Sequence, residues 1–582
     1  MKSFGSSKSL NVRKGRTELQ RVAAVVVDCP VVGYRVHEDE DKHQEADDVA
    51  NPRDDQRITL ERFTLHRRRH KAEHEAECGQ LLLDENMGRH ATLAVAGTVS
   101  YGYGVLLTAL AFLCLVLSLA EIASALPFAG GVFGLARCTL GFCTAFVVGC
   151  CELLQYVIYS SVGLFVTTQV LSQRLPSLEG FEPLIWIVMQ SLVFLIMLQG
   201  GRLFWRTIFG LATVSLVVVF FYCLSAMTNA DMAKYTGGGD LTSQGGLSAF
   251  FQAFPNAIWL FSGIESLATL STYVEDPCKS IPKGQIPSLC TLLASCCCIY
   301  LAAISLPPGA AALPGVFAVL NGGFSAGFDT TDATATLFSL PAVVASIPGF
   351  SLASSNLLTA LAKSNLVSPV FGPSQPSPQK ATRPLLVVSV LNVTVCFVLQ
   401  YIGAPDVVFT VMMALGFGCY ITQGLAFISW RKRHNRVPRL LVSPVGTVGA
   451  MLSVVVFAMG LVSALCCQND SFHALIATGG VISVLTAYYH GVAKQRQTFS
   501  KEEHVLLFFG HVDTSMSVLP SERAGWWRRL LLLVLIKGRR RGHDTSRPTI
   551  PKKFSTIAPS LLTQRSEPRT NVVHVGHVGS IN

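Results

Sequence analysis

Charge is what the middle of this 582-residue chain lacks most. Residues 101–490 hold only 15 Lys and Arg and 13 Asp and Glu, whereas residues 1–100 hold 16 and 17. Residues 491–582 hold 15 and 6. Apolar runs of roughly 20 residues recur through the charge-poor middle, and a bilayer-spanning helix needs about this length. The composition therefore predicts a polytopic membrane protein with two charged tails.

Several common patterns are also absent, and each absence excludes a class of protein or site. Residues 1–20 are polar and lack the apolar core of a signal peptide. The 17 cysteines include no CxxC pair and no metal-like Cys/His spacing, so we interpret them as small residues between helices. No zinc-protease, P-loop or kinase pattern is present. We therefore expect neither an enzyme nor a bound cofactor or metal.

The net charge of +10 does not indicate nucleic-acid binding. The excess of basic residues lies in the C-terminal tail and in loops between the predicted spans. Both places fit attraction to an anionic cytoplasmic leaflet, so the lipid bilayer is the expected partner.

The chain divides into three parts. Residues 1–90 alternate basic and acidic blocks and are expected to form a disordered tail. Residues 91–490 are the predicted membrane domain, and residues 491–582 are a basic tail in which 524–540 fits an interfacial helix. Eleven spans are predicted, at about 103–124, 143–170, 183–200, 204–226, 249–272, 284–305, 334–356, 384–402, 405–428, 441–466 and 472–490.

Basic residues are unevenly distributed among the predicted loops. If alternate loops face the cytoplasm, starting after the 103–124 span, the inner loops hold 13 of the 15 Lys and Arg of residues 101–490. Only Arg174 and Lys234 then face outward. This positive-inside pattern places the C-terminal tail in the cytoplasm. It also places the charged N-terminal tail outside unless one more span precedes residue 103, and the sequence contains no full span there.

The stretch Trp259–Ser266 does not suit a continuous transmembrane helix. Gly263 weakens the helix locally, and Glu265 places a carboxylate at bilayer depth, which costs several kcal/mol unless it is paired or hydrated. We therefore predict a helix break whose freed backbone groups line a cavity and hold a ligand. Glu265 would then couple transport to protons. Alternatively, it is a structural carboxylate bonded to the backbone near the break.

Two other carboxyl groups lie within predicted spans. Glu152 and Tyr156 are four residues apart and share a helix face, with Gln155 beside them. This face either lines a transport pathway or forms an interhelical hydrogen bond. Glu121 lies at the inner end of its span, close in sequence to Arg137, so a structural ion pair or a helix-end role is expected before a transport role.

Three serines cluster at the end of the 334–356 span: Ser351, Ser354 and Ser355. Their hydroxyls could complete a sodium site, or they could bond backbone carbonyls of their own helix. We expect the second arrangement, which makes the proton the expected coupling ion and sodium the lesser candidate.

Three stretches together resemble the amino acid–polyamine–organocation superfamily, in particular amino acid and ethanolamine permeases. Ser118–Arg137 (SLAEIASALPFAGGVFGLAR) is similar to the signature at the end of that family's second helix. Trp259–Ser266 (WLFSGIES) is similar to the family's broken sixth helix, and Glu275–Gly284 (EDPCKSIPKG) to the segment that follows it. Their order and spacing make the resemblance specific, and it covers about 95–500.

The resemblance implies an all-α transporter fold of two inverted five-helix repeats, in which the first and sixth helices are unwound at mid-membrane. By motif match, the resemblance implies that Trp259, Ser262 and Glu265 contact the substrate or are linked to protons, and that the unwound backbone around Phe261–Ile264 meets the substrate. The shared helix face adds Tyr156 as a substrate-binding candidate and Glu152, beside Glu265, as a proton-coupling candidate. The motif residues concerned are Trp259, Phe261, Ser262, Gly263, Ile264 and Glu265.

The sequence departs from the family at its first helix. Gly97–Leu119 already aligns with the family's second helix, so most of the first helix is missing and about 11 spans remain instead of 12. Either a segment was lost from the coding sequence, or the protein is a degenerate relative. We expect a secondary transporter of an amino acid or related amine in the plasma membrane. The alternative is a transport-defective homologue that acts as a nutrient sensor or partner subunit.

Overall fold

The computed structural model describes residues 97–499, apart from 127–129, 237–245, 275, 311, 314–317, 373–381, 402–404, 435–436, 438 and 469–471. These residues form helices and connecting turns, without a strand. Among the described residues, eleven helical spans are long and apolar enough to cross a membrane, in agreement with the predicted number. The expected tail at 1–90 and the expected interfacial helix at 524–540 lie outside the described residues.

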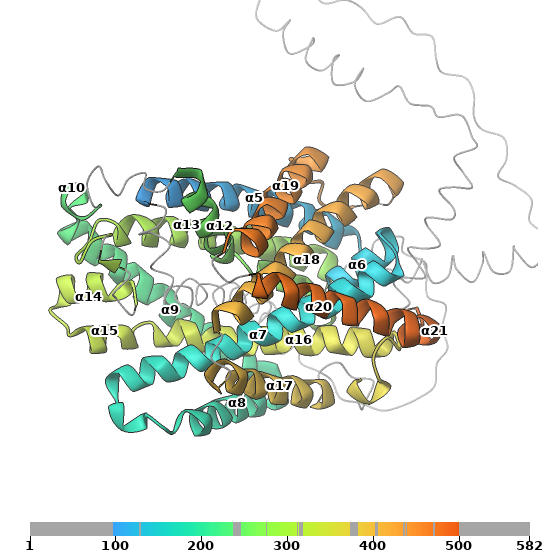
Figure 1. Ribbon diagram of the computed structural model, residues 1–582, viewed down its shortest axis with the longest axis horizontal. Coiled ribbons are helices and arrows are strands. Elements are labelled where there is room, and N and C mark those ends of the chain that lie inside the picture. The colour runs from blue at the N-terminus through green and yellow to red at the C-terminus, as the bar shows by residue number, and fades with distance from the viewer. Residues whose placement is uncertain are drawn as a thin grey trace, which may run out of the picture. The chain divides into compact units, whose positions relative to one another are not determined.

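The spans follow the predicted order along the chain (Figure 1). The long helices are α5 (Thr98–Ala125), α7 (Phe142–Arg174), α8 (Glu182–Gln199), α9 (Gly201–Asn229), α12 (Gly246–Trp259) with the 3-10 helix η2 (Ile264–Tyr273), α13 (Pro277–Ala303), α15 (Asp332–Leu337) with α16 (Leu340–Lys363), α17 (Thr382–Tyr401), α18 (Pro405–Arg433), α19 (Gly446–Cys466) and α20 (His473–Tyr488). Shorter helices connect them, including α6 (Val132–Thr139), α10 (Met232–Tyr235) and α14 (Leu320–Phe328).

α7 and α16 pack against each other at the centre of the described region (Figure 1). α8 and α17 lie together on one side of this pair, while α5, α13 and α19 lie on the other. The outer helices expose large apolar side chains such as Leu192 of α8 and Phe220 of α9. A helix that is apolar on all sides is stable in this position because lipid solvates its outer face.

The first and second halves of the membrane domain repeat the same helices in the same order. α5 and α13 have 28 and 27 residues, α6 and α14 have 8 and 9, α8 and α17 have 18 and 20, and α9 and α18 both have 29. Contacts repeat too, because α7 packs on α18 as α16 packs on α9, and α6 packs on α18 as α14 packs on α9. Counterparts are five spans apart and therefore cross the membrane in opposite directions. The predicted inverted repeat is confirmed.

The second repeat begins with the broken span α12–η2. Its counterpart would precede α5, and no such element is present among the residues that the structure describes.

The inner end of α5 is tied to the connection between α18 and α19. Glu121 is fully buried, and its carboxylate forms ion pairs with Arg439 and, at 3.6 Å, with Arg431. The sequence suggested Arg137 as the partner, and that expectation is wrong, since the Arg137 guanidinium lies over three phenylalanine rings. The segments that meet here are both inner loops in the predicted orientation, so the ion pair agrees with it.

Candidate functional site

The fifth span is broken at the position that the sequence predicts. α12 carries Pro255 in its interior and ends at Trp259. Residues 260–263 form turns, and Gly263 has a φ of 109°, in a region that favours glycine. The chain then continues as η2. Because glycine adopts this conformation at little steric cost, Gly263 allows the span to change direction inside the membrane domain.

Glu265 lies in the first turn after the break and is 2% exposed. Its Oε2 atom accepts a hydrogen bond from the Gly263 backbone N–H at 2.9 Å. Its Oε1 atom accepts hydrogen bonds from the hydroxyls of Tyr420 at 3.0 Å and Tyr156 at 3.5 Å. One oxygen therefore stabilises the break, as the structural interpretation expects. The other belongs to a polar cluster between helices.

The Tyr156 hydroxyl lies between two buried carboxyl groups. It contacts Oε1 of Glu152 at 3.0 Å, one turn earlier on α7, as well as Glu265. A hydroxyl has a single proton, so Tyr156 donates to only one carboxylate at a time. Two neighbouring anions in a site of low dielectric repel each other strongly. The arrangement can therefore hold a proton and pass it between α7 and η2.

Tyr420 of α18 belongs to this cluster and was not identified from the sequence. Its hydroxyl accepts a hydrogen bond from Nε2 of Gln155 at 3.2 Å while it donates to Glu265. Gln155 also donates to Tyr159 at 2.9 Å. A Cβ atom at Gly416 would lie 2.7 Å from Gln155 Nε2, so the glycine allows the amide to approach α18. Tyr420 lies in an apolar span without a periodic polar face, so the sequence pattern does not mark it. Its role depends on how the helices pack.

The other residues of the break surround this cluster. The Trp259 indole packs edge-on against Tyr159 of α7, with ring centroids 4.4 Å apart, and lies 4.6 Å from the ring of Phe409 on α18. The remaining predicted residues of the break are also buried: Phe261, Ser262 and Ile264. The structure thus brings Trp259, Glu265, Tyr156 and Glu152 together between α7 and α18. That they contact a substrate stays a prediction.

Three buried polar atoms of the region have no hydrogen-bond partner in the described part of the chain: Glu152 Oε2, Gln155 Oε1 and Trp259 Nε1. Leaving a buried donor or acceptor unsatisfied costs about 1–3 kcal/mol. Such atoms therefore call for a water molecule or a ligand. The set comprises two acceptors and one donor.

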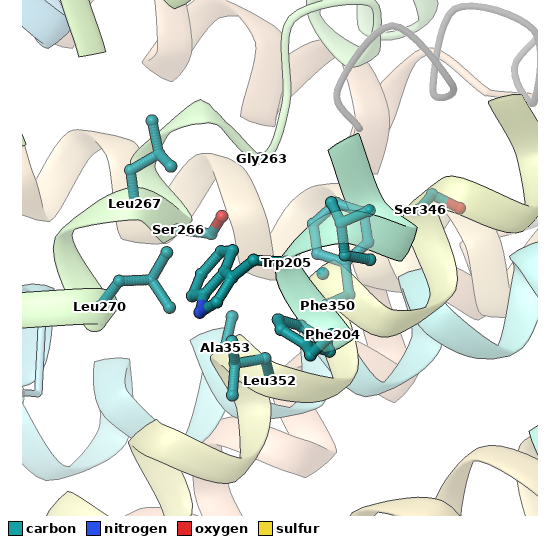
Figure 2. Close-up of a pocket in the computed structure, with 12 residues that line it drawn as sticks. Phe204, Trp205, Gly263, Ser266, Leu267, Leu270, Ser346, Phe350, Leu352 and Ala353 are labelled. Atoms are coloured by element: carbon teal, nitrogen blue, oxygen red, sulfur yellow. The ribbon is translucent and has the colours of Figure 1, made fainter. Parts of the chain in front are cut away.

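A cavity opens next to the break, between α9, η2 and α16 (Figure 2). Its enclosed volume is about 50 Å³. Of the predicted site residues, only Gly263 lines it. Figure 2 shows the Trp205 indole between the leucines of η2 and the side chains of α16. The principal lining residues are Trp205, Ser266, Leu267, Leu270, Gly349 and Phe350.

Two of the three predicted serines of α16 form side-chain hydrogen bonds within the protein. The Ser351 hydroxyl lies 2.8 Å from that of Ser160 and accepts a hydrogen bond from Asn392 at 3.1 Å. The Ser354 hydroxyl donates to a backbone carbonyl one turn earlier. These bonds favour the structural alternative over a sodium site.

A broken span, a cluster of buried carboxyl groups at the break and an inverted repeat of helices together define a membrane carrier. The chain belongs to the amino acid permease family, whose model matches residues 86–483. It is therefore a multi-pass membrane transporter of a small molecule and not an enzyme, as the sequence predicts.

No curated protein matches the chain. Among solved structures, the chain is similar to the structure of Mhp1, a nucleobase-cation-symport-1 family transporter, in a closed conformation with bromovinylhydantoin bound. The identity is 12% and the TM-score 0.43, over 76% of this chain and 96% of that one.

Proposed function

We propose that this protein is a secondary transporter of an amino acid or a related small amine, such as ethanolamine or a polyamine, coupled to protons by alternating access. The observation that carries the proposal is the pair of buried carboxyl groups, Glu265 and Glu152, that share the Tyr156 hydroxyl beside a broken helix. Ionisable groups at bilayer depth commonly mark proton relays and substrate pathways.

The polar atoms near the break support an amine as substrate. Gln155 Oε1 and Glu152 Oε2 are acceptors that could receive N–H groups of an ammonium. Trp259 Nε1 is a donor for an acceptor group on the same solute. The unwound backbone around Phe261–Ile264 would meet a carboxylate, hydroxyl or ammonium group of the substrate. We place the protein in the plasma membrane, with its C-terminal tail in the cytoplasm.

Uptake into proteoliposomes with an imposed pH gradient tests the proposal. With ¹⁴C-labelled amino acids or ethanolamine, uptake should rise as the outside becomes more acidic, because a proton must accompany the substrate. Glu265→Gln carries a permanently neutral side chain and should remove this dependence on pH. Glu179→Gln, in an exposed loop, makes the same charge change and should leave the dependence intact.

Two results would contradict the proposal in different ways. Unchanged pH dependence in Glu265→Gln would remove this residue from proton coupling. Uptake equal to empty liposomes for every labelled amine would reject transport of these solutes altogether.

The alternative function is that of a transport-defective permease homologue that serves as a nutrient sensor or partner subunit. The observation that favours it comes from the sequence, in which Gly97–Leu119 already resembles the family's second helix and most of the first is missing. A sensor would bind an amine without moving it. Its unfolding temperature would then rise with the ligand while uptake stayed at background.

A further inference from the structure

The segment that follows the last span packs on the inner ends of other helices. α20 continues through the π-helical turn η6 (Tyr489–Ala493) and the short helix α21 (Lys494–Arg496), and residues 497–499 then run without regular structure. The Tyr489 ring lies 5.7 Å from that of Phe146 on α7. The start of the C-terminal tail is therefore held against the membrane domain.

Thr498 caps the end of α16 with its backbone and with its side chain. Its N–H donates to the Ser364 carbonyl at 3.0 Å, and its hydroxyl donates to the Lys363 carbonyl at 3.4 Å. The same hydroxyl accepts a hydrogen bond from Nδ2 of Asn365 at 3.2 Å. α16 ends at Lys363, and the last carbonyls of a helix have no partner within it. Thr498 supplies that partner.

Phe499 attaches the same segment to the corner between α6 and α7. Its ring lies 5.5 Å from that of Phe142, and the Arg137 guanidinium of α6 lies 4.9 Å from its centre. α6 begins directly after Gly131, where a Cβ atom would lie 3.2 Å from Thr269 of η2. Residues 497–499, which we call the docked segment, thus link the end of α16 to an element that abuts the inner part of the broken span.

Thr498 has the features of a kinase substrate. It is exposed, lies outside regular structure and follows the basic residues Arg496 and Lys494 by two and four positions. Kinases select substrates by their charge pattern, and one class of them prefers basic residues before the hydroxyl group. Because the docked hydroxyl is bonded to two groups of the end of α16, the undocked form is the one that a kinase can modify.

We propose that Thr498 is a phosphorylation site for a protein kinase that recognises basic residues, and that its phosphate keeps the docked segment off the end of α16. The γ-phosphoryl group of ATP is transferred to Oγ1. A bond forms between this oxygen and the phosphorus, the bond from the phosphorus to the departing ADP breaks, and the hydroxyl proton goes to solvent.

Two changes at Oγ1 prevent the segment from docking again. The modified oxygen has no proton to donate to the Lys363 carbonyl. The phosphate also carries about −1.5 to −2 charges, and the C-terminal end of a helix disfavours negative charge. Modification of the undocked form therefore shifts the population toward that form.

Undocking frees α6 on the inner side of the domain. Because Gly131 abuts Thr269, the docked segment restrains the inner part of the broken span through α6, and phosphorylation should raise the rate of uptake. This effect rests on the proposed transport function and on the cytoplasmic position of the tail. The modification and the undocking rest on neither.

Phosphorylation of the purified full-length protein tests the proposal. The protein is incubated with ATP and a purified kinase of this class, and the phosphate is located by peptide mass spectrometry. Hydrogen exchange then reports on docking, because the Thr498 N–H is bonded to α16 only in the docked form. The expected result is phosphate on Thr498 and exchange about 5-fold faster or more in the peptide that holds residues 497–499. The peptide around Asp231, whose N–H donates to Ser305 on the other side of the domain, is the reference and should not change.

Variants separate the site from a general effect of charge. Thr498→Glu should give the faster exchange without kinase, whereas Gln495→Glu, which adds the same charge at an exposed position of α21, should not. Phosphate only on other residues overturns the proposal, and so does unchanged exchange in the protein phosphorylated on Thr498. Equal uptake by Thr498→Glu and the unmodified protein would overturn the effect on transport. Faster exchange without uptake by any form would support the site and reject the transport function instead.

Discussion

Tyr420 shows how single side chains of distant helices form the polar cluster. Its hydroxyl joins Gln155 of α7 to Glu265 of η2, so one residue of α18 fixes the positions of groups on two other elements. Hydrogen bonds to charged groups contribute about 1.5–3 kcal/mol each, more than bonds between neutral groups. Of the hydrogen bonds made by Tyr420, the bond to Glu265 should therefore contribute the most free energy.

Removing the Tyr420 hydroxyl should slow transport while the fold is kept. In Tyr420→Phe the ring remains packed between Phe112 and Phe457, but Glu265 loses its 3.0 Å donor. We expect the initial rate of amine uptake to fall about 10-fold or more, the equivalent of a lost bond to a charged group. Tyr401→Phe, at an exposed ring, is the matched control. Equal rates in the two variants would show that the hydroxyl has no role in transport.

Glu121 is a second carboxylate whose environment gives a direct prediction, this time of stability. The side chain of Arg439 is 10% exposed, and Glu121→Gln would leave it without its anionic partner. Breaking a buried ion pair on one side costs about 3–5 kcal/mol. The unfolding temperature of the purified protein, measured by scanning fluorimetry, should therefore drop clearly.

The Lys279–Asp276 pair provides the comparison for this experiment. Both side chains are 56% exposed, so Lys279→Gln should change stability by about 0.5 kcal/mol or less. If the two variants unfolded at the same temperature, the Glu121 ion pair would not hold α5 to the α18–α19 connection.

At the scale of the element, the broken span depends on the backbone of Gly263. Its φ of 109° lies where a residue with a Cβ is strained, at a cost of about 1–3 kcal/mol. Gly263→Ala should therefore lower the unfolding temperature and reduce uptake together, since Glu265 bonds to this N–H. Gly210→Ala, at an exposed helical position with open space around it, should be neutral or slightly stabilising. Equal effects of the two substitutions would argue against a strained break.

The break and the spans could be predicted from sequence because the bilayer imposes strong rules. A helix needs about 20 apolar residues, and a glycine beside a carboxylate at mid-span conflicts with a continuous helix. Which side of each helix faces protein and which faces lipid could not be predicted. Lipid and protein both accept apolar side chains, so no amphipathic pattern marks the buried side. Tyr420 was missed for this reason. The sequence points to Arg137 as the partner of Glu121 because the two are near in sequence, whereas packing decides that Glu121 meets Arg439.

At the scale of the whole molecule, the contacts between loops agree with a single orientation in the membrane. The inner end of α5 meets the α18–α19 connection through Glu121, and Arg433 donates to the carbonyl of Thr139, the last residue of α6. On the opposite side, the Asp231 N–H donates to the Ser305 carbonyl. Segments that the positive-inside pattern assigns to the same side thus contact each other, although they are far apart in the sequence.

This orientation can be tested with cysteines placed at exposed positions on the two sides. Ala230→Cys lies at the end of α9 that should face outward, and Lys279→Cys lies at the start of α13 that should face the cytoplasm. In intact cells, a membrane-impermeant maleimide should label the first above the background of the native cysteines and the second only after permeabilisation. The opposite result would invert the orientation and place the C-terminal tail outside. Labelling of both only after permeabilisation would place the protein in an internal membrane, because neither side would then contact the medium.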